Sequence, residues 1–205
     1  EDDDEGAPEE EAEESAGGDE KWKRVWALRD VSVDIPPGVV FGVLGDADSG
    51  KSTLVRVLAG ALRPTRGRVV CHGRIGPIPD LARLFMRPDR PARQNVLAVA
   101  RYAGSPRALS GREADEIVRF VNGAHREAPT PTMLLQHLAL ATVLFLEPDV
   151  LFLDDLTFAE GEFRERCLER IEARRGEATV VLASRDAALL GALCSEAILL
   201  ESGSI

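Results

Sequence analysis

The stretch that decides the fold runs from residue 39 to residue 62 and reads VVFGVL, GDADSGKS and TLVRVLAGAL. Its first part, residues 39–44, is a continuous apolar run rich in β-branched side chains, which is typical of a strand buried on both faces. Residues 45–52 match the pattern G-x-x-x-x-G-K-[ST] without a mismatch. Apolar residues then recur at the spacing of one helical face up to residue 62. The stretch therefore predicts a buried strand, a glycine-rich loop and an amphipathic helix in direct succession.

The chemistry of this loop favours polyphosphate binding. Gly45 and Gly50 let the backbone curl so that successive N–H groups point toward phosphate oxygens. Lys51 adds a positive charge for the β- and γ-phosphates, and Ser52 offers a hydroxyl to Mg²⁺. The helix that follows presents unpaired N–H groups and the positive end of its dipole to the same anion. We expect ATP and Mg²⁺ to bind here, with contacts from Gly45, Asp46, Ala47, Asp48, Ser49, Gly50, Lys51, Ser52 and Thr53.

Two acids inside the loop act against this binding. Asp46 and Asp48 place negative charge beside a polyphosphate, which weakens its binding unless their side chains point to solvent or reach Mg²⁺.

The remainder of the chain alternates between strand and helix patterns. Apolar strands are predicted at 150–153, 179–183 and 197–200, with helices at 162–175 and 187–194. This alternation indicates an α/β fold with a mainly parallel sheet, the RecA-like core of a P-loop NTPase. Short strands at 31–35 and 68–71 suggest a small antiparallel β part near the start, and residues 73–95 are expected to form loops. A helical insertion is expected at about 95–146, with breaks at 104–106 and 128–131.

The charge of the chain is unevenly distributed. Of its 205 residues the first twenty carry twelve acids and no base, which predicts a disordered tail at 1–20 and a folded domain at 21–205. This tail is either a solvating segment or a docking segment for a basic partner. The folded part, with 23 acids and 25 lysines and arginines, is nearly neutral, so we expect no nucleic acid partner.

The cysteines and apolar runs point to the cytosol. Cys71, Cys167 and Cys194 are odd in number and lack a C-x-x-C spacing, which favours reduced thiols. No secretory leader is evident, and the apolar run at 134–146 is too short to span a bilayer.

With these segments assembled, the chain resembles the ATP-binding subunit of ABC transporters over about residues 24–205. The residues that carry the resemblance are ALRDVS at 27–32, LRPTRGRV at 62–69, EPDVLFLD at 147–154, LASRD at 182–186 and the closing segment at 193–203. The segment at 147–154 is similar to the family's Walker B strand, and the one at 182–186 to its switch loop. Arg87-Pro88-Asp89, followed by ARQNV at 92–96, is most similar to exporters of polysaccharide, O-antigen or teichoic acid.

The resemblance implies roles for several residues. Asp154 holds Mg²⁺ together with Ser52, and Asp155 orients the attacking water. Arg185 occupies the switch position near the γ-phosphate, and Trp26 either stacks on adenine or serves in packing. The implied catalytic residues are therefore Lys51, Asp155 and Arg185. Two copies, or one copy and a paralogue, would form a dimer on an integral membrane subunit, peripheral on the inner face of the cell membrane.

Three positions depart from the family pattern. Asp155 stands where the family has a glutamate, and Arg185 replaces the switch histidine and could equally form a surface salt bridge. Pro131 lies in the signature region, residues 129–133, and has no N–H to donate to a phosphate. Thr130 can still cap a helix whose first residue is Pro131.

Two functional hypotheses follow from these departures. The chain is either a hydrolysing ATPase that powers export of a cell-surface polymer, or a degenerate subunit that binds ATP with little or no hydrolysis. A kinase or GTPase is disfavoured because no Asn-Lys-x-Asp motif occurs. Gln94 is a candidate for the polar residue of the coupling loop. His72, His125 and His137 have no ligand spacing and are expected to be structural or surface residues.

Overall fold

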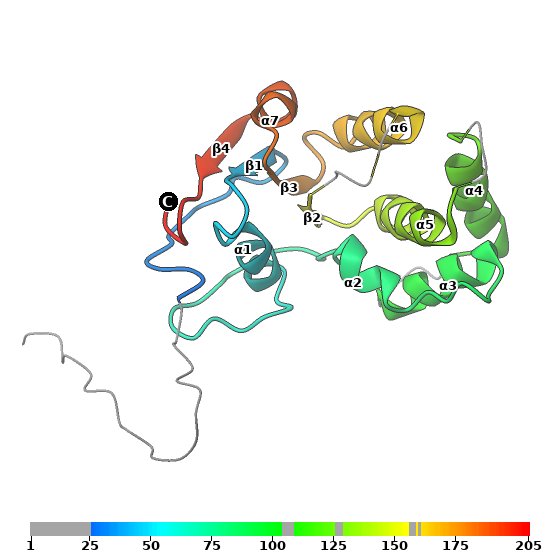
Figure 1. Cartoon of the computed structure of the whole chain (residues 1–205), viewed down its shortest axis with the longest axis horizontal. Coiled ribbons are helices and arrows are strands. Elements are labelled where there is room, and N and C mark those ends of the chain that lie inside the picture. The colour runs from blue at the N-terminus through cyan, green and yellow to red at the C-terminus, as the bar shows by residue number, and fades with distance from the viewer. Residues whose placement is uncertain (1–25, 104–108, 126–128, 156–158, 160) are drawn as a thin grey trace, which may run out of the picture.

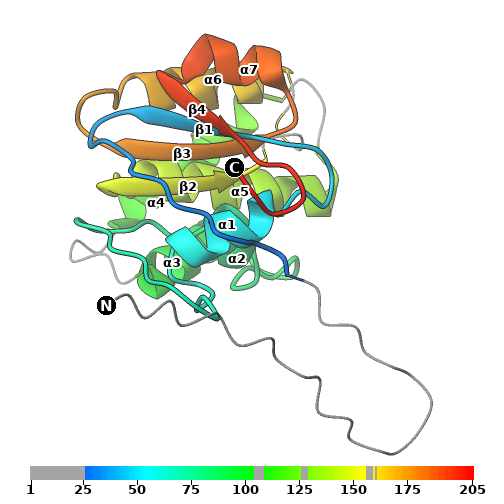
Figure 2. The ribbon, with the colours of Figure 1, turned by 90° about the vertical axis from the view of Figure 1, so that its left-hand side faces the viewer.

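Four parallel strands form the central sheet of the computed structural model, which describes residues 26–103, 109–125, 129–155, 159 and 161–205. The strands are β1 (Val40–Leu44), β2 (Val150–Asp154), β3 (Thr179–Ser184) and β4 (Glu196–Leu199). Their order across the sheet is β2-β3-β1-β4, which Figure 2 shows from bottom to top. In this register Leu44 lies opposite Ser184 and Asp154 opposite Ala183, so β1, β2 and β3 end at the same edge. That edge follows the carboxyl ends of the strands, where α/β folds place their ligand sites.

Both faces of the sheet are covered, as the continuous apolar strands require. Alternate residues of each strand point to opposite faces. Figure 2 shows α1 (Lys51–Leu58) in front of the sheet, with α5 (Pro131–Phe145) and α6 (Gly161–Glu172) behind it. On the α1 side, Phe41 and Val43 pack with Leu54 and Val55. On the other side Val40 belongs to a larger core that includes buried residues of α5, α6 and α7 (Ala187–Leu193).

Three long helices form a group at one end of the molecule, away from β4 (Figure 1). They are α3 (Ala92–Tyr102), α4 (Gly111–Asn122) and α5 (Pro131–Phe145), preceded by the short α2 (Pro79–Arg83). They lie in the stretch expected to be helical, and α5 is almost entirely buried from His137 to Leu144. The expected break at 104–106 and the acidic tail at 1–20 lie outside the described residues, as does part of the second break.

The remaining helices, α6 (Gly161–Glu172) and α7 (Ala187–Leu193), follow β2 and β3 as the alternation predicted. The helix after the phosphate loop is shorter than expected, because it ends at Leu58 and gives way to turns. Within the described residues no helix has the length and hydropathy needed to cross a membrane.

The prediction of two short strands in a small antiparallel β part, at 31–35 and 68–71, is wrong. Val31, Val33 and Ile35 are half-buried and pack on the core beside α1, with exposed residues between them. In the part of the chain that the structure describes, however, neither 31–35 nor 68–71 forms a strand. The alternation therefore predicted correctly which side chains face the core. It did not predict strand pairing, because pairing also requires a neighbouring strand. The expected loop at 73–95 likewise contains α2 and the start of α3.

Candidate functional site

The glycine-rich loop connects β1 to α1 and is tightly confined at both of its glycines. A Cβ on Gly45 would lie 2.5 Å from the carbonyl oxygen of Leu200 and 2.5 Å from Ser49 Oγ. Gly50 has a φ of +99°, and a Cβ there would lie 2.6 Å from the carbonyl oxygen of Ala27. Both contacts are far closer than a real Cβ makes, so the loop requires glycine at these two positions.

Lys51 reaches back across the loop from the first turn of α1. Its Nζ donates to the carbonyl oxygens of Gly45 at 2.7 Å and Asp46 at 2.5 Å, and to Ser49 Oγ at 3.3 Å. The helix has no side-chain cap at Gly50 and no acid in its first turn. Its first N–H groups therefore have no intrahelical acceptor and, with the ammonium group, suit an anion. Asp46 and Asp48 are exposed, the arrangement in which solvent screens their charge most strongly.

A hydrogen bond joins the phosphate loop to the acidic end of β2. Ser52 Oγ donates to Asp154 Oδ1 at 3.0 Å, although 102 positions separate the two residues. Burial raises the pKa of Asp154, while the Ser52 hydroxyl and the nearby Arg56 act in the opposite direction. A hydroxyl beside a carboxylate is a ligand pair that Mg²⁺ accepts when water and phosphate oxygens complete its octahedron. Nowhere in the described ranges do three His, Cys, Asp or Glu residues form a metal cluster.

A depression of about 510 Å³ opens over this loop. It is lined by Trp26, Ala27, Ser202 and residues 48–53. This volume lies in the range of small-ligand sites. Trp26 is 50% exposed, so its ring is available to a planar ligand, and Arg66 Cζ lies 6.0 Å from the ring centroid. The structure thus brings Trp26 to the phosphate loop, as predicted, and its role in adenine binding stays a prediction.

A turn near residue 203 is hydrogen-bonded to the backbone of the phosphate loop. Gly203 N–H donates to the carbonyl oxygen of Ser49 at 3.0 Å, and Arg29 N–H donates to the carbonyl oxygen of Gly203 at 2.8 Å. Three segments far apart in the sequence therefore share one hydrogen-bonded network at the loop.

The two other predicted catalytic residues follow neighbouring strand ends. Asp155 comes directly after β2, where its N–H donates to the carbonyl oxygen of Ala183 at 3.0 Å, and its φ of +59° is unusual for a residue with a side chain. Arg185 comes directly after β3 and is exposed. The next residue, Asp186, caps α7 by accepting from Leu189 N–H at 2.9 Å. Both candidates thus lie near the phosphate loop, and their catalytic roles stay predictions.

The signature region begins α5 in the way the sequence indicated. Thr130 is the N-cap, with its Oγ1 accepting from Met133 N–H at 3.3 Å, and Pro131 is the first helical residue. The hydroxyl of Thr130 is thereby engaged in the helix terminus.

Sequence reasoning missed the role of Asn95, which is 1% exposed at the start of α3. Its Oδ1 accepts from Arg87 N–H at 2.8 Å, and its Nδ2 donates to the carbonyl oxygens of Arg87 at 2.8 Å and Arg90 at 3.3 Å. Asn95 therefore fixes the Arg87-Pro88-Asp89 segment. The sequence did contain a signal for this role, because a polar amide on an apolar helical face is buried and needs hydrogen-bond partners. Gln94, the coupling-loop candidate, is exposed beside it.

Two of the histidines expected to be ordinary are in contact. His125 Nε2 lies 2.9 Å from His137 Nδ1, and the fully buried His137 ring stacks on Phe163 with 3.9 Å between centroids. His137 is structural, as expected, but the two residues form a pair that their separation in the sequence did not reveal.

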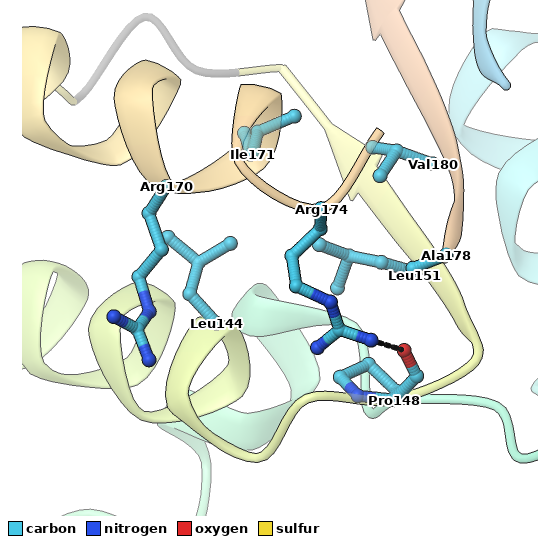
Figure 3. A pocket seen from close by; sticks show the side chains of 8 residues that line it. All are labelled: Leu144, Pro148, Leu151, Arg170, Ile171, Arg174, Ala178 and Val180. Carbon is cyan, nitrogen blue, oxygen red and sulfur yellow. Dashed lines mark hydrogen bonds between the residues drawn. The ribbon is translucent and has the colours of Figure 1, made fainter. Parts of the chain in front are cut away.

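A second cavity, shown in Figure 3, does not have the properties of a ligand site. It measures about 20 Å³, room for about one water, and lies among Leu144, Leu151 and the stems of Arg170 and Arg174. Arg174 Nη2 donates to the carbonyl oxygen of Pro148 at 3.4 Å, and Arg170 Cζ lies 3.6 Å from the Phe145 ring centroid. The first contact joins the turn after α6 to the segment before β2, and the second packs α6 against α5.

A phosphate loop between a central parallel strand and a helix, with a carboxylate at the end of a nearby strand, defines a P-loop NTPase. Residues 28–123 match the family described as ABC transporter. The solved dimeric, post-hydrolysis ATP-binding cassette MJ0796, bound to ADP and Pi, matches with a TM-score of 0.74 at 21% identity and covers 91% of both chains. The chain is thus similar to the ABC transporter family over residues 28–123, and its fold is that of the solved ATP-binding cassette.

Two relatives are named for different transport processes. The O-antigen export system ATP-binding protein RfbB of Myxococcus xanthus is 30% identical over 187 residues, which are 88% of this chain and 43% of the relative. The methionine import ATP-binding protein MetN of Geobacillus kaustophilus is 30% identical over 208 residues, which are 88% of this chain and 59% of the relative. The chain thus spans about half the length of these relatives.

Proposed function

We propose that this chain is the subunit of an ABC transporter that binds and hydrolyses ATP. The observation that carries the proposal is the hydrogen bond of 3.0 Å between Ser52 and Asp154, next to a loop whose lysine and helix terminus suit a polyphosphate. The bond holds together the two side chains that would bind one cation.

Each residue then has a defined task. The ammonium group of Lys51 would leave the loop carbonyls and donate hydrogen bonds to the β- and γ-phosphates instead. The first N–H groups of α1 would bind oxygens of the same phosphates. Bound Mg²⁺ supplies positive charge to the leaving and transferring phosphates. Ser52 and Asp154 would orient that cation, Asp155 would accept a hydrogen bond from the attacking water, and Arg185 would pair with the γ-phosphate.

We propose further that the chain works as a dimer beneath an integral membrane subunit, as a peripheral protein on the cytoplasmic side. Exposed apolar residues directly after α2 and at the end of α3 support a protein partner. Leu84 is 73% exposed, and Phe85 and Tyr102 are 41% and 48% exposed and stack with 3.7 Å between ring centroids. Exposed aromatic pairs of this kind mark interaction surfaces.

The transported substrate in this proposal is a polysaccharide or a related cell-surface polymer. Its support is the Arg87-Pro88-Asp89 segment and the buried Asn95 that fixes it. Relatives from Myxococcus xanthus and Klebsiella pneumoniae are named for O-antigen export, whereas the MetN relatives are named for methionine import. Transport assays with the cognate membrane subunit, with a lipid-linked glycan and with methionine as alternative substrates, would separate the two.

Asp155 favours the second hypothesis, a subunit that binds ATP but hydrolyses it slowly. Its carboxylate is one methylene shorter than that of glutamate, and a displacement of about 1 Å at a reacting centre costs about 100-fold in rate. The test is steady-state ATPase activity of the assembled transporter. Turnover above that of Lys51→Ala supports hydrolysis, and a rise of about tenfold or more in Asp155→Glu supports a misplaced base. Turnover equal to that of Lys51→Ala would refute hydrolysis by this subunit.

A further inference from the structure

A strip of positive charge follows α1. Between Asp48 and Asp80 the sequence has no acid but carries Lys51 and five arginines. Residues 61–73 are all exposed and contain Arg63, Arg66 and Arg68. We call residues 61–73 the basic strip. Thirteen consecutive exposed residues with this charge form an anion-attracting surface.

Two arginines of the strip, Arg63 and Arg68, differ from many others on the surface. Arg87 and Arg93, for example, form ion pairs with Asp89 and Asp115, each at 3.3 Å. Within the described ranges, no acid forms an ion pair with Arg63 or Arg68. Their charge therefore has to be balanced by solvent ions or by a segment outside those ranges.

The chain supplies a suitable segment in residues 1–20, which carry twelve acids and no base. Only residues 21–25 separate it from Trp26, whose ring lies 6.0 Å from Arg66 Cζ. Figure 1 agrees with this placement, because the coloured ribbon begins beside the loop that follows α1. Five residues reach up to about 17 Å, enough to bring the acids over the strip. A tether this short keeps the effective concentration of the acids in about the millimolar range.

We propose that residues 1–20 dock on the basic strip and thereby lower the affinity of the neighbouring depression for Mg·ATP. The second half rests on the proposed function. Trp26 lines the depression and also contacts the strip, so the two sites are adjacent. The acidic segment and the polyphosphate are both polyanions, and a docked segment cancels the positive potential that would attract the nucleotide. This competition is strong at low salt and is screened at high salt.

Docking is tested first, without nucleotide, on the full chain. The matched variant keeps the length of residues 1–20 but has every Asp replaced by Asn and every Glu by Gln. In NMR spectra at low salt, we expect the side-chain Nε–H signals of Arg63 and Arg68 to differ between the two proteins. The difference should disappear at about 0.5 M salt. Identical signals in both proteins at low salt would overturn the proposal.

Nucleotide affinity is measured next by calorimetry. At low salt the neutral-tail variant should bind Mg·ATP about threefold more tightly than the unmodified chain, and at about 0.5 M salt the two should agree. Replacing Arg63 and Arg68 by Gln should remove the difference between acidic and neutral tails. A difference that survives this replacement would overturn the regulatory half. Absence of ATP binding in all variants would refute the proposed function, whereas the NMR result on docking would stand.

The same NMR spectra distinguish docking of residues 1–20 from two alternative occupants of the basic strip. The two alternative occupants are anionic phosphatidylglycerol vesicles and single-stranded RNA, and each is added to both proteins. If only the vesicles or only the RNA shift the Arg63 and Arg68 signals, and the tail charges have no effect, then the strip serves that partner and docking of residues 1–20 is refuted.

Discussion

Replacing Gly50 with alanine tests whether the phosphate loop is confined by the segment that precedes β1. Gly50 has a φ of +99°, and a Cβ would lie 2.6 Å from the carbonyl oxygen of Ala27. The left-handed conformation alone costs an alanine about 1 kcal/mol. Displacing a backbone carbonyl adds about 2 kcal/mol, a typical cost of overpacking. At about 3 °C per kcal/mol for a domain of this size, Gly50→Ala should lower the Tm by about 9 °C.

Gly60→Ala is the matched control for this change. Gly60 also has a positive φ, +72°, but nothing lies within 4 Å of its Cβ position. It should therefore lose only the conformational part, about 1 kcal/mol or about 3 °C. Calorimetry should find unchanged Mg·ATP affinity in Gly60→Ala and a loss of tenfold or more in Gly50→Ala. Equal Tm losses, with Mg·ATP bound equally by both variants, would refute the reasoning that Ala27 fixes the loop.

Three further substitutions test the candidate metal ligand Asp154, the buried amide of Asn95 and the α5 cap Thr130. Burial raises the pKa of Asp154, so its contribution to stability is present at acidic pH and is lost as pH rises through the folded-state pKa. The urea resistance of Asp154→Asn relative to the unmodified protein should therefore increase between about pH 4 and pH 7. The variant should also lose its stabilisation by Mg·ATP. A difference in urea resistance that stays constant across this pH range would contradict the pKa argument. Asn95→Ala should cost about 2–3 kcal/mol in urea unfolding, because it leaves the buried partners of its amide unsatisfied, while exposed Gln94→Ala should stay within about 0.5 kcal/mol. Thr130→Val removes the α5 cap and should cost about 1 kcal/mol by the same assay, and no change would show that the cap contributes nothing.

The position of the phosphate loop could be predicted from the sequence because its parts are consecutive. The buried strand, the glycines and the helical face follow one another between 39 and 62, so local pattern alone specified them. The approach of Asp154 to Ser52 needed one further rule, that parallel strands end at the same edge of a sheet. Both residues lie at that edge, 3.0 Å apart.

Other features depend on contacts that no local pattern encodes. Val31, Val33 and Ile35 alternate as expected and face the core, but a strand also requires a neighbour with matching register. His125 and His137 meet because α4 and α5 pack together, and neither residue has a local motif. Asn95 looks like a polar interruption of a helix until the loop that it binds is folded against it.

The turn at residue 203 makes the candidate nucleotide site sensitive to events at a distant part of the chain. Its glycine connects the carbonyl oxygen of Ser49 to the N–H of Arg29, so residues more than 150 positions from the phosphate loop set the loop's shape. Ribosomal synthesis produces this turn after all four strands, so the hydrogen bond from Gly203 to Ser49 forms only after the strands have been made. The unfinished chain should accordingly have no competent nucleotide site, and a proteolytic cut just before Glu201 should abolish ligand binding while leaving the sheet assembled.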